Sequence, residues 1–243
     1  MSKCRPLEAT RRRLLTTASC LIAAASAVAQ VPPPAAASSS SVYVVAYIEV
    51  HAASVPVGTA LLRRYAHQAH AEAGNLAVDA FEELGRVNRF VVVERWRHQA
   101  AFAAHEMAPN TAEFTHQLKL IQRSPADERI THGFAIDPRA PSPSLKGVYS
   151  VTHVDVPGPK GPDTEVLLRQ YAVQARAAPG NLRYDVYQQD QPRLNHFEVF
   201  AAWSNRGSSE AFEDSAASLK FREALAPLLG ALYDERLYRP IRP

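Results

Sequence analysis

Glu94 and its neighbours on one predicted strand are the first residues whose types and spacing could do chemistry. Glu94 shares strand parity with Phe90 and Trp96, so it places an acid on an otherwise apolar face. A carboxyl group in such a place is either a site residue with a raised pKa or one half of an ion pair. Arg95, Arg97 or an arginine from the other half of the chain is the partner that an ion pair would need.

His105 is the second candidate, nine residues beyond Trp96 on the helix expected to cover that strand. A histidine titrates near neutrality and can accept a phenolic proton, so we predict His105 and Glu94 as catalytic residues. The alternative is a solvated or core histidine. We predict an aromatic wall for a substrate from Phe90, Trp96, Phe102 and Trp203, although recurrence of the tryptophan in both halves also favours packing.

Other patterns are weaker. His67 and His70 stand one helical turn apart near Glu72, a spacing that a metal could use, but histidines on an exposed helix are commonly just solvated. The sequence contains no GxGxxG or GxSxG motif. We therefore expect no metal site and no nucleotide cofactor.

The elements that position these residues are encoded twice. Residues 42–50 return 106 positions later as 148–156, and residues 61–69 return as 167–175 with seven of nine identical. A repeat of this length is the size of a domain. Where the copies agree we expect architecture, and where they differ we look for function. Glu94 aligns with Ala201 and His105 aligns with Phe212, so only the first copy keeps both ionisable groups.

Each copy predicts the order strand–helix–strand–strand–helix–strand. Alternating apolar residues indicate strands, and an apolar stripe at helical spacing indicates a helix that begins near Pro56 and ends before Gly74. The expected segments of the first copy are a strand at 42–51, that helix, a strand pair at 76–83 and 88–96, a helical stretch at 98–122 interrupted near Pro109, and a strand at 127–135.

This order predicts an α+β fold of two ferredoxin-like βαββαβ repeats, each an antiparallel sheet with its helices on one face. The other face carries Tyr43, Val45, Tyr149 and Val151, which a lone domain would expose. We therefore expect the two sheets to pack into an intramolecular dimeric α/β barrel, monomeric in solution. The expected domains span 42–137 and 147–239, joined by a Pro- and Ser-containing linker at 138–146.

The first 29 residues have the pattern of an export signal. A basic segment with Arg11-Arg12-Arg13 precedes an apolar stretch and Ala27-Val28-Ala29, and the arginines resemble a twin-arginine signal. We expect a periplasmic or secreted protein, tethered by a Pro/Ala/Ser linker at 30–41 and free of the membrane after cleavage. A membrane anchor is the alternative, but the apolar stretch is too short to span a bilayer. A lipoprotein modified at Cys20 is a further one.

Removing the signal changes the composition. Residues 1–29 hold five of the 27 basic and one of the 24 acidic side chains, which leaves 22 against 23 in the remainder. A near-neutral protein has no long-range field that attracts nucleic acid. Both cysteines, Cys4 and Cys20, also leave, which excludes a thiolate nucleophile, a disulfide and a Cys-ligated metal.

The residues resemble the antibiotic biosynthesis monooxygenase family of dimeric α/β-barrel proteins. In the first copy the resemblance rests on Gly74-Asn75-Leu76, on Phe90, Glu94 and Trp96, and on Ala104-His105; the second copy keeps Gly180-Asn181-Leu182, Phe197 and Trp203. The resemblance implies quinol or anthrone oxygenases that use no cofactor, haem-degrading relatives, or proteins without known activity. Family members mostly pair two separate chains, whereas this sequence fuses them.

Three functions follow as hypotheses. The first is an exported, cofactor-independent monooxygenase that oxidises a quinol or other phenolic aromatic with O2, using His105 or Glu94 as base. The second is a protein of the same fold that binds a small hydrophobic ligand without turnover. The third is a haem-degrading enzyme, with haem as the ligand.

Overall fold

The computed structural model describes residues 41–139 and 143–241. The predicted export signal at 1–29, and all of the tether at 30–41 except Ser41, lie outside the described residues. Within the described part of the chain, no helix is long and apolar enough to cross a membrane.

The elements follow the predicted order in both repeats. The first repeat contains β1 (Val42–Glu49), α1 (Val55–His70), β2 (Asn75–Glu83), β3 (Arg89–Trp96), α2 (Gln99–Glu106), α3 (Pro109–Ile121) and β4 (Asp127–Ala135). The second contains β5 (Val148–Asp155), α4 (Gly161–Ala177), β6 (Asn181–Gln189), β7 (His196–Trp203), α5 (Arg206–Glu213), α6 (Ala216–Leu225) and β8 (Asp234–Pro240). The predicted interruption near Pro109 is the break between α2 and α3, because proline is favoured in the first turn of a new helix.

The eight strands form one closed antiparallel barrel in the order β1-β3-β2-β8-β5-β7-β6-β4. Each repeat supplies four consecutive strands, with its first strand between its third and fourth. The repeats join through β2 with β8 and β4 with β6. The two sheets are therefore hydrogen-bonded at both edges as well as packed face to face, which leaves no free strand edge among the described strands. The predicted fold class is confirmed.

The barrel interior is an apolar core shared by both repeats. Tyr43, Val45, Tyr149 and Val151 are all buried there, as predicted. Tyr43 stacks on Tyr187 of the other repeat with ring centroids 4.7 Å apart, and Phe81 lies 4.8 Å from Tyr149. Because aromatic pairs across the interface bury large areas, neither sheet is expected to remain folded with this face in water.

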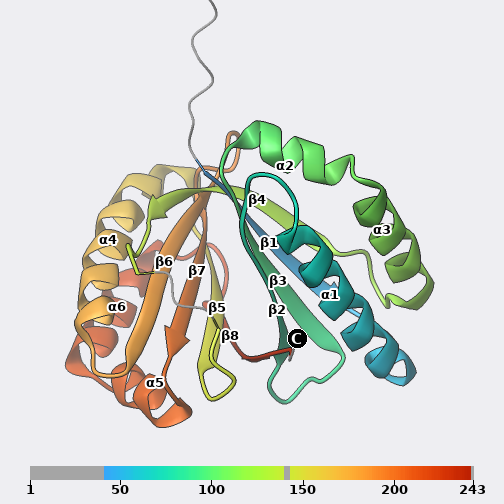
Figure 1. Cartoon of the computed structure of the whole chain (residues 1–243). Helices are drawn as coiled ribbons and strands as arrows, with labels where there is room; N and C mark the ends of the chain where they lie inside the picture. The colour runs from blue at the N-terminus through green and yellow to red at the C-terminus, as the bar shows by residue number, and fades with distance from the viewer. Residues whose placement is uncertain (1–40, 140–142, 242–243) are drawn as a thin grey trace, which may run out of the picture. The chain divides into compact units, whose positions relative to one another are not determined.

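The helices cover the outer face of the barrel, α1 to α3 over the strands of the first repeat and α4 to α6 over those of the second (Figure 1). Helix α1 buries the predicted stripe of Leu61, Leu62, Tyr65 and Ala69. After α1, Gly74 has φ +84°, and a Cβ there would lie 2.5 Å from the Cβ of Ala101. A glycine is therefore required where the chain passes under α2, the helix that carries His105.

Candidate active site

Glu94 lies on the outer face of β3, beneath the helices, and is only 4% exposed. The Trp96 indole N–H donates to Glu94 Oε2 at 2.8 Å, and the Tyr65 hydroxyl donates to Oε1 at 2.5 Å. The charged group nearest to pairing with Glu94 is His105, with Nε2 3.8 Å from Oε2, and not one of the arginines considered for an ion pair. Arg95 is the next residue along the strand, and successive side chains of a strand point to opposite faces, so Arg95 points away from Glu94. Both Glu94 oxygens are held by neutral donors.

His105 comes from α2 and is 2% exposed. Its Nε2 lies 2.8 Å from the Tyr65 hydroxyl oxygen, and its Nδ1 lies 2.8 Å from Glu72 Oε2. The imidazole stacks on the indole of Trp96 with ring centroids 4.4 Å apart. Both ring nitrogens are therefore engaged, and the ring orientation is fixed from three sides.

Glu72, which follows α1, begins a chain of hydrogen bonds that runs through His105 and Tyr65 to Glu94. The Asn110 side chain donates to Glu72 Oε1 at 2.6 Å, which fixes the carboxylate against Nδ1 of His105. Thr111 Oγ1 lies 3.3 Å from the same nitrogen. Because an ionised carboxylate only accepts hydrogen bonds, Nδ1 carries a proton and donates it to Glu72.

The two contacts of the Tyr65 hydroxyl group set how many protons Glu94, Tyr65 and His105 share. A tyrosine hydroxyl has one hydrogen, and it lies between two acceptors, His105 Nε2 and Glu94 Oε1. Both short contacts are hydrogen bonds only when these three groups share two protons. With one proton, one of the contacts lacks a hydrogen. The arrangement can therefore pass a proton between Glu94 and His105 through the Tyr65 hydroxyl group.

A cavity of about 180 Å³ opens beside this chain of groups. Its wall contains Glu94, Tyr65, His105 and Phe102 together with Val44, Glu106, Thr111, Phe114, Thr115 and Glu128. Of the residues predicted for the site, Glu94, His105 and Phe102 line it. Trp96 is fully buried behind His105 and does not line it.

Two predicted aromatic residues lie elsewhere. Phe90 is packed in the core of the first repeat, four residues before Glu94 on the same strand face, and does not line the cavity. Trp203 is packed in the core of the second repeat, with its ring centroid 5.0 Å from that of Phe212.

The electrostatics of the cavity keep Tyr65 neutral. Burial, and then the Glu94 carboxylate, raise the pKa of Tyr65 far above its ordinary value. Tyr65 can therefore transfer a proton while remaining a hydroxyl group. At the rim, partial removal from water and the charge of Glu94 raise the pKa of Glu128.

The second repeat keeps the scaffold of this site without its ionisable groups. Tyr171, the equivalent of Tyr65, donates instead to Ser218 Oγ at 2.9 Å. Phe212 takes the place of His105 beside the tryptophan, and Ala201 and Ala178 take the places of Glu94 and Glu72. Phe221 stacks on Tyr171 with ring centroids 3.7 Å apart, where Phe114 stacks on Tyr65 at 4.1 Å. The packing is conserved between the copies and the acid–base groups are not.

Sequence reasoning missed Tyr65 and Glu72 as site residues. Tyr65 recurs as Tyr171, so the comparison between copies assigned it to architecture. Glu72 differs from its counterpart, Ala178, and the rule that singled out Glu94 and His105 identifies it as well. We had considered Glu72 only beside His67 and His70, which are exposed on α1.

Two other cavities are larger. One of about 260 Å³ lies at the barrel mouth. Another, of about 600 Å³, is a more apolar groove along α1. Its wall includes Pro143 and Ile241, which adjoin residues outside the described ranges. Neither cavity is lined by Glu94 or His105.

The antibiotic biosynthesis monooxygenase family model matches residues 41–117 and 147–224, once in each repeat. The chain belongs to this family. A curated relative is the monooxygenase-like protein YcnE of Bacillus subtilis (strain 168), which is 29% identical over 82 residues, covering 34% of this chain and 86% of YcnE. That relative therefore corresponds in length to about one repeat.

Solved structures match the whole barrel. A candidate monooxygenase from Fusobacterium nucleatum has a TM-score of 0.76 at 12% identity, over 84% of this chain and 94% of its own. An anthrone oxidase-like protein has a TM-score of 0.67 at 11% identity, over 84% and 92%. At these identities the likeness concerns the fold. Because each match spans most of both chains, two-repeat single chains also occur among these structures.

Proposed function

We propose that this protein is an exported monooxygenase that oxidises a small quinol or related phenolic aromatic with O2, without a bound cofactor, in the cavity of the first repeat. The family assigns it to the monooxygenases. The observation that carries the proposal is the hydrogen-bond chain from half-buried Glu72 through buried His105 and Tyr65 to buried Glu94, which borders a cavity with an aromatic wall. Deprotonation of a phenol needs a general base beside the bound ring, and these residues supply one.

The cavity volume favours a small ring system. An apolar cavity of roughly 150 Å³ holds benzene, and sites for drug-sized ligands are roughly 300–1,000 Å³. At about 180 Å³, the cavity suits a one-ring or small two-ring phenol, and a three-ring anthrone requires Phe102 or Phe114 to move. Haem is disfavoured by its size. It is also disfavoured because both nitrogens of His105 are already hydrogen-bonded.

The proposed reaction balances with O2 as the only co-substrate. The relay takes the phenolic proton, and the resulting anion gives one electron to O2. The aryl radical and superoxide then combine, forming a C–O bond at a ring carbon that bears hydrogen, and the peroxide takes up a proton. Loss of that carbon's proton and cleavage of the O–O bond give a carbonyl and release water. One oxygen atom enters the quinone product and the other leaves as water.

The protein's contribution is to hold protons and exclude solvent. The two-proton state of Tyr65, His105 and Glu94 has all its hydrogen bonds made, so it stabilises the proton taken from the substrate. The half-buried Glu72 carboxylate stabilises the imidazolium that forms, as an acid does beside a catalytic histidine. The aromatic wall of Phe102 and Phe114 orients the ring beside O2.

The test is oxygen uptake with a panel of one- to three-ring quinols and anthrone, with ¹⁸O2 to count the atoms incorporated. We expect one labelled atom in the product and activity losses of roughly 100-fold or more for Glu94→Ala and His105→Ala. His116→Ala, an exposed histidine on α3, serves as the control and retains activity.

Equal uptake by the wild type and both site variants would contradict the roles assigned to Glu94 and His105. Stabilisation of the fold by the same aromatics, with no oxygen consumed by the wild type, would instead favour the ligand-binding hypothesis.

A further inference from the structure

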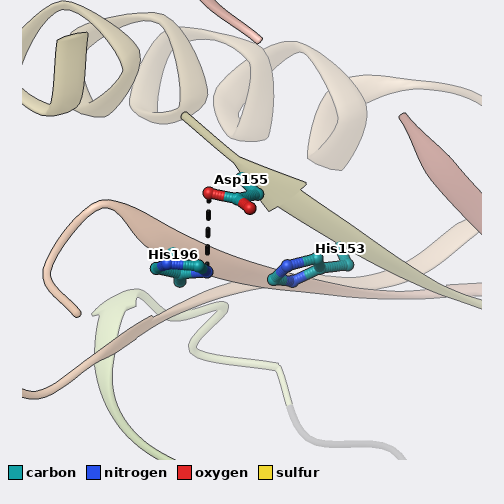
Figure 2. A group of neighbouring side chains, drawn as sticks. All are labelled: His153, Asp155 and His196. Carbon is teal, nitrogen blue, oxygen red and sulfur yellow. Dashed lines mark ion pairs between the residues drawn. The ribbon is translucent and has the colours of Figure 1, made fainter. Parts of the chain in front are cut away.

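His153, Asp155 and His196 form a second cluster of chemical groups, at one end of the barrel interior (Figure 2). His153 and Asp155 are two residues apart on β5, and Asp155 pairs with His196 on β7 in the strand register. Their side chains share the inward face with Val151 of the barrel core. His196 is half-buried, with 20% of its side chain exposed.

We propose that these three side chains form a binding site for a divalent transition-metal ion such as Zn²⁺. One possible ligand atom from each residue lies within 4.8 Å of the others. Two imidazoles and a carboxylate are a common ligand set for such ions. With three protein ligands the ion keeps a further position for water or another ligand.

The distance between Asp155 and His196 fits a shared ion. Asp155 Oδ1 and His196 Nδ1 are 3.6 Å apart, too far for a hydrogen bond. Ligands about 2.1 Å from a tetrahedral zinc ion lie about 3.4 Å from each other. Figure 2 shows the Asp155 carboxylate facing His196, and the ring of His153 next to that of His196. The centroids of the two imidazole rings are 5.7 Å apart.

Glu198 orients His153 for this role. Its carboxylate is fully buried and lies 2.8 Å from His153 Nδ1. Because the carboxylate accepts, Nδ1 carries the proton and Nε2 keeps its lone pair for a metal. Carboxylate–histidine–metal arrangements fix the ligand in this way in most histidine metal sites.

Arg129 and Arg193 are the cations whose charges act on the cluster through His196. Arg129 is bonded to Glu198 and also to Asp127 at 2.7 Å. With neutral imidazoles, the three carboxylates Asp127, Asp155 and Glu198 outnumber the two arginines by one, so the surroundings of the cluster stay negative and favour a cation. His153 also lines the cavity of about 260 Å³ at the barrel mouth, which gives an ion a route from solvent.

The first repeat supplies an internal comparison. In the same strand register, Tyr47 and Glu49 replace His153 and Asp155, and Arg89 replaces His196. There the carboxylate has a cationic partner, with Arg89 3.5 Å from Glu49. The second repeat keeps the carboxylate as Asp155 and has histidines in place of Tyr47 and Arg89. The cluster is thus specific to one copy, and it lies on the opposite sheet face from Glu94.

The experiment is titration of the metal-free full-length protein with Zn²⁺ by calorimetry and with Co²⁺ by visible absorption. We expect one ion per chain and tetrahedral or five-coordinate Co²⁺ bands. His196→Asn and Asp155→Asn each weaken binding at least about 10-fold. The double variant His67→Ala/His70→Ala removes two exposed histidines of α1 and binds as the wild type does.

Both site variants replace half-buried side chains, so circular dichroism is expected to match that of the wild type. Wild-type protein that binds no ion, or binding of equal strength in the wild type and both site variants, overturns the proposal. Loss of binding only in the α1 double variant also overturns it, because the ion then binds at His67 and His70. The metal test does not measure oxygen uptake, so its result is independent of whether the proposed oxygenase reaction occurs.

Discussion

Replacement of Tyr65 by phenylalanine tests whether its hydroxyl group connects the acid and the histidine. The change removes one oxygen atom and keeps the ring that stacks on Phe114. It leaves Glu94 and His105, which are 4% and 2% exposed, without a shared hydrogen-bond partner. A hydrogen bond to a charged group stabilises the fold by roughly 1.5–3 kcal/mol, and a buried polar group that loses its hydrogen-bond partner costs about 1–3 kcal/mol. We therefore expect the free energy of unfolding to fall by about 3 kcal/mol.

The second repeat provides the matched control. Tyr171→Phe removes the same atom from the equivalent position, where the hydroxyl makes a single neutral hydrogen bond to Ser218. That loss is worth about 1 kcal/mol. At roughly 2–4 °C per kcal/mol for a chain of this size, the expected decrease in Tm is about 6–12 °C for Tyr65→Phe and about 2–4 °C for Tyr171→Phe.

Activity should separate the two variants further. If Tyr65 passes the proton, Tyr65→Phe lowers kcat for quinol oxidation roughly 100-fold or more, whereas Tyr171→Phe leaves it unchanged. The assays are urea denaturation, thermal denaturation and oxygen uptake on the same preparations. Equal losses of stability in the two variants, or full activity in Tyr65→Phe, would refute the proton-counting argument.

Three further predictions concern the site and its supports. His105→Phe copies the residue of the second repeat, Phe212, so we expect a folded protein by circular dichroism with oxygen uptake lowered roughly 100-fold or more, as for His105→Ala; wild-type oxygen uptake would count against His105. Gly74→Ala should lower the free energy of unfolding by more than Gly85→Ala in urea denaturation. Both glycines have positive φ, which costs an alanine roughly 1–2 kcal/mol, but only at Gly74 would the added Cβ also clash with Ala101. Equal losses in the two variants would contradict the clash. Burial opposes ionisation of Asp137, but hydrogen bonds from Arg139 and from backbone N–H groups lower its pKa below the ordinary 3.8. The wild type is therefore more stable than Asp137→Asn by the full amount well above pH 3.8, and this advantage is lost as the pH falls through the lower folded-state pKa of Asp137. A difference in free energy of unfolding that does not change with pH in acid denaturation would contradict this.

Much of the fold could be predicted because it is encoded twice. Alternation along residues 42–50 and its return at 148–156 fix two equivalent strands, and apolar residues on both faces of those strands require a covering on each side. What the pattern does not specify is the pairing of β2 with β8 and of β4 with β6. Those contacts depend on matching edge lengths and twist between distant segments, which periodicity does not encode.

The candidate site could be predicted only in part. Strand parity placed Glu94 under the helices, and the difference between copies selected His105. The same parity excludes Arg95 as the partner of Glu94, and this could have been inferred from the sequence alone. The role of Tyr65 depends on distances of 2.5 and 2.8 Å, which side-chain packing sets. His153 and His196 are 43 residues apart, and only the register of β5 with β7 brings them together.

The most direct test of the central claim is to locate the aromatic ligand by ¹⁹F NMR. The chain has two tryptophans, one in each repeat, and both can be replaced by 5-fluorotryptophan. Trp203→Phe assigns the two resonances. In an anaerobic titration with 1,4-dihydroxynaphthalene, ligand in the first repeat's cavity lies next to His105, which stacks on Trp96. We predict that the Trp96 resonance shifts and saturates while that of Trp203 stays in place. A shift of Trp203 alone, or of neither resonance despite binding, would contradict the assignment of the substrate site to the first repeat.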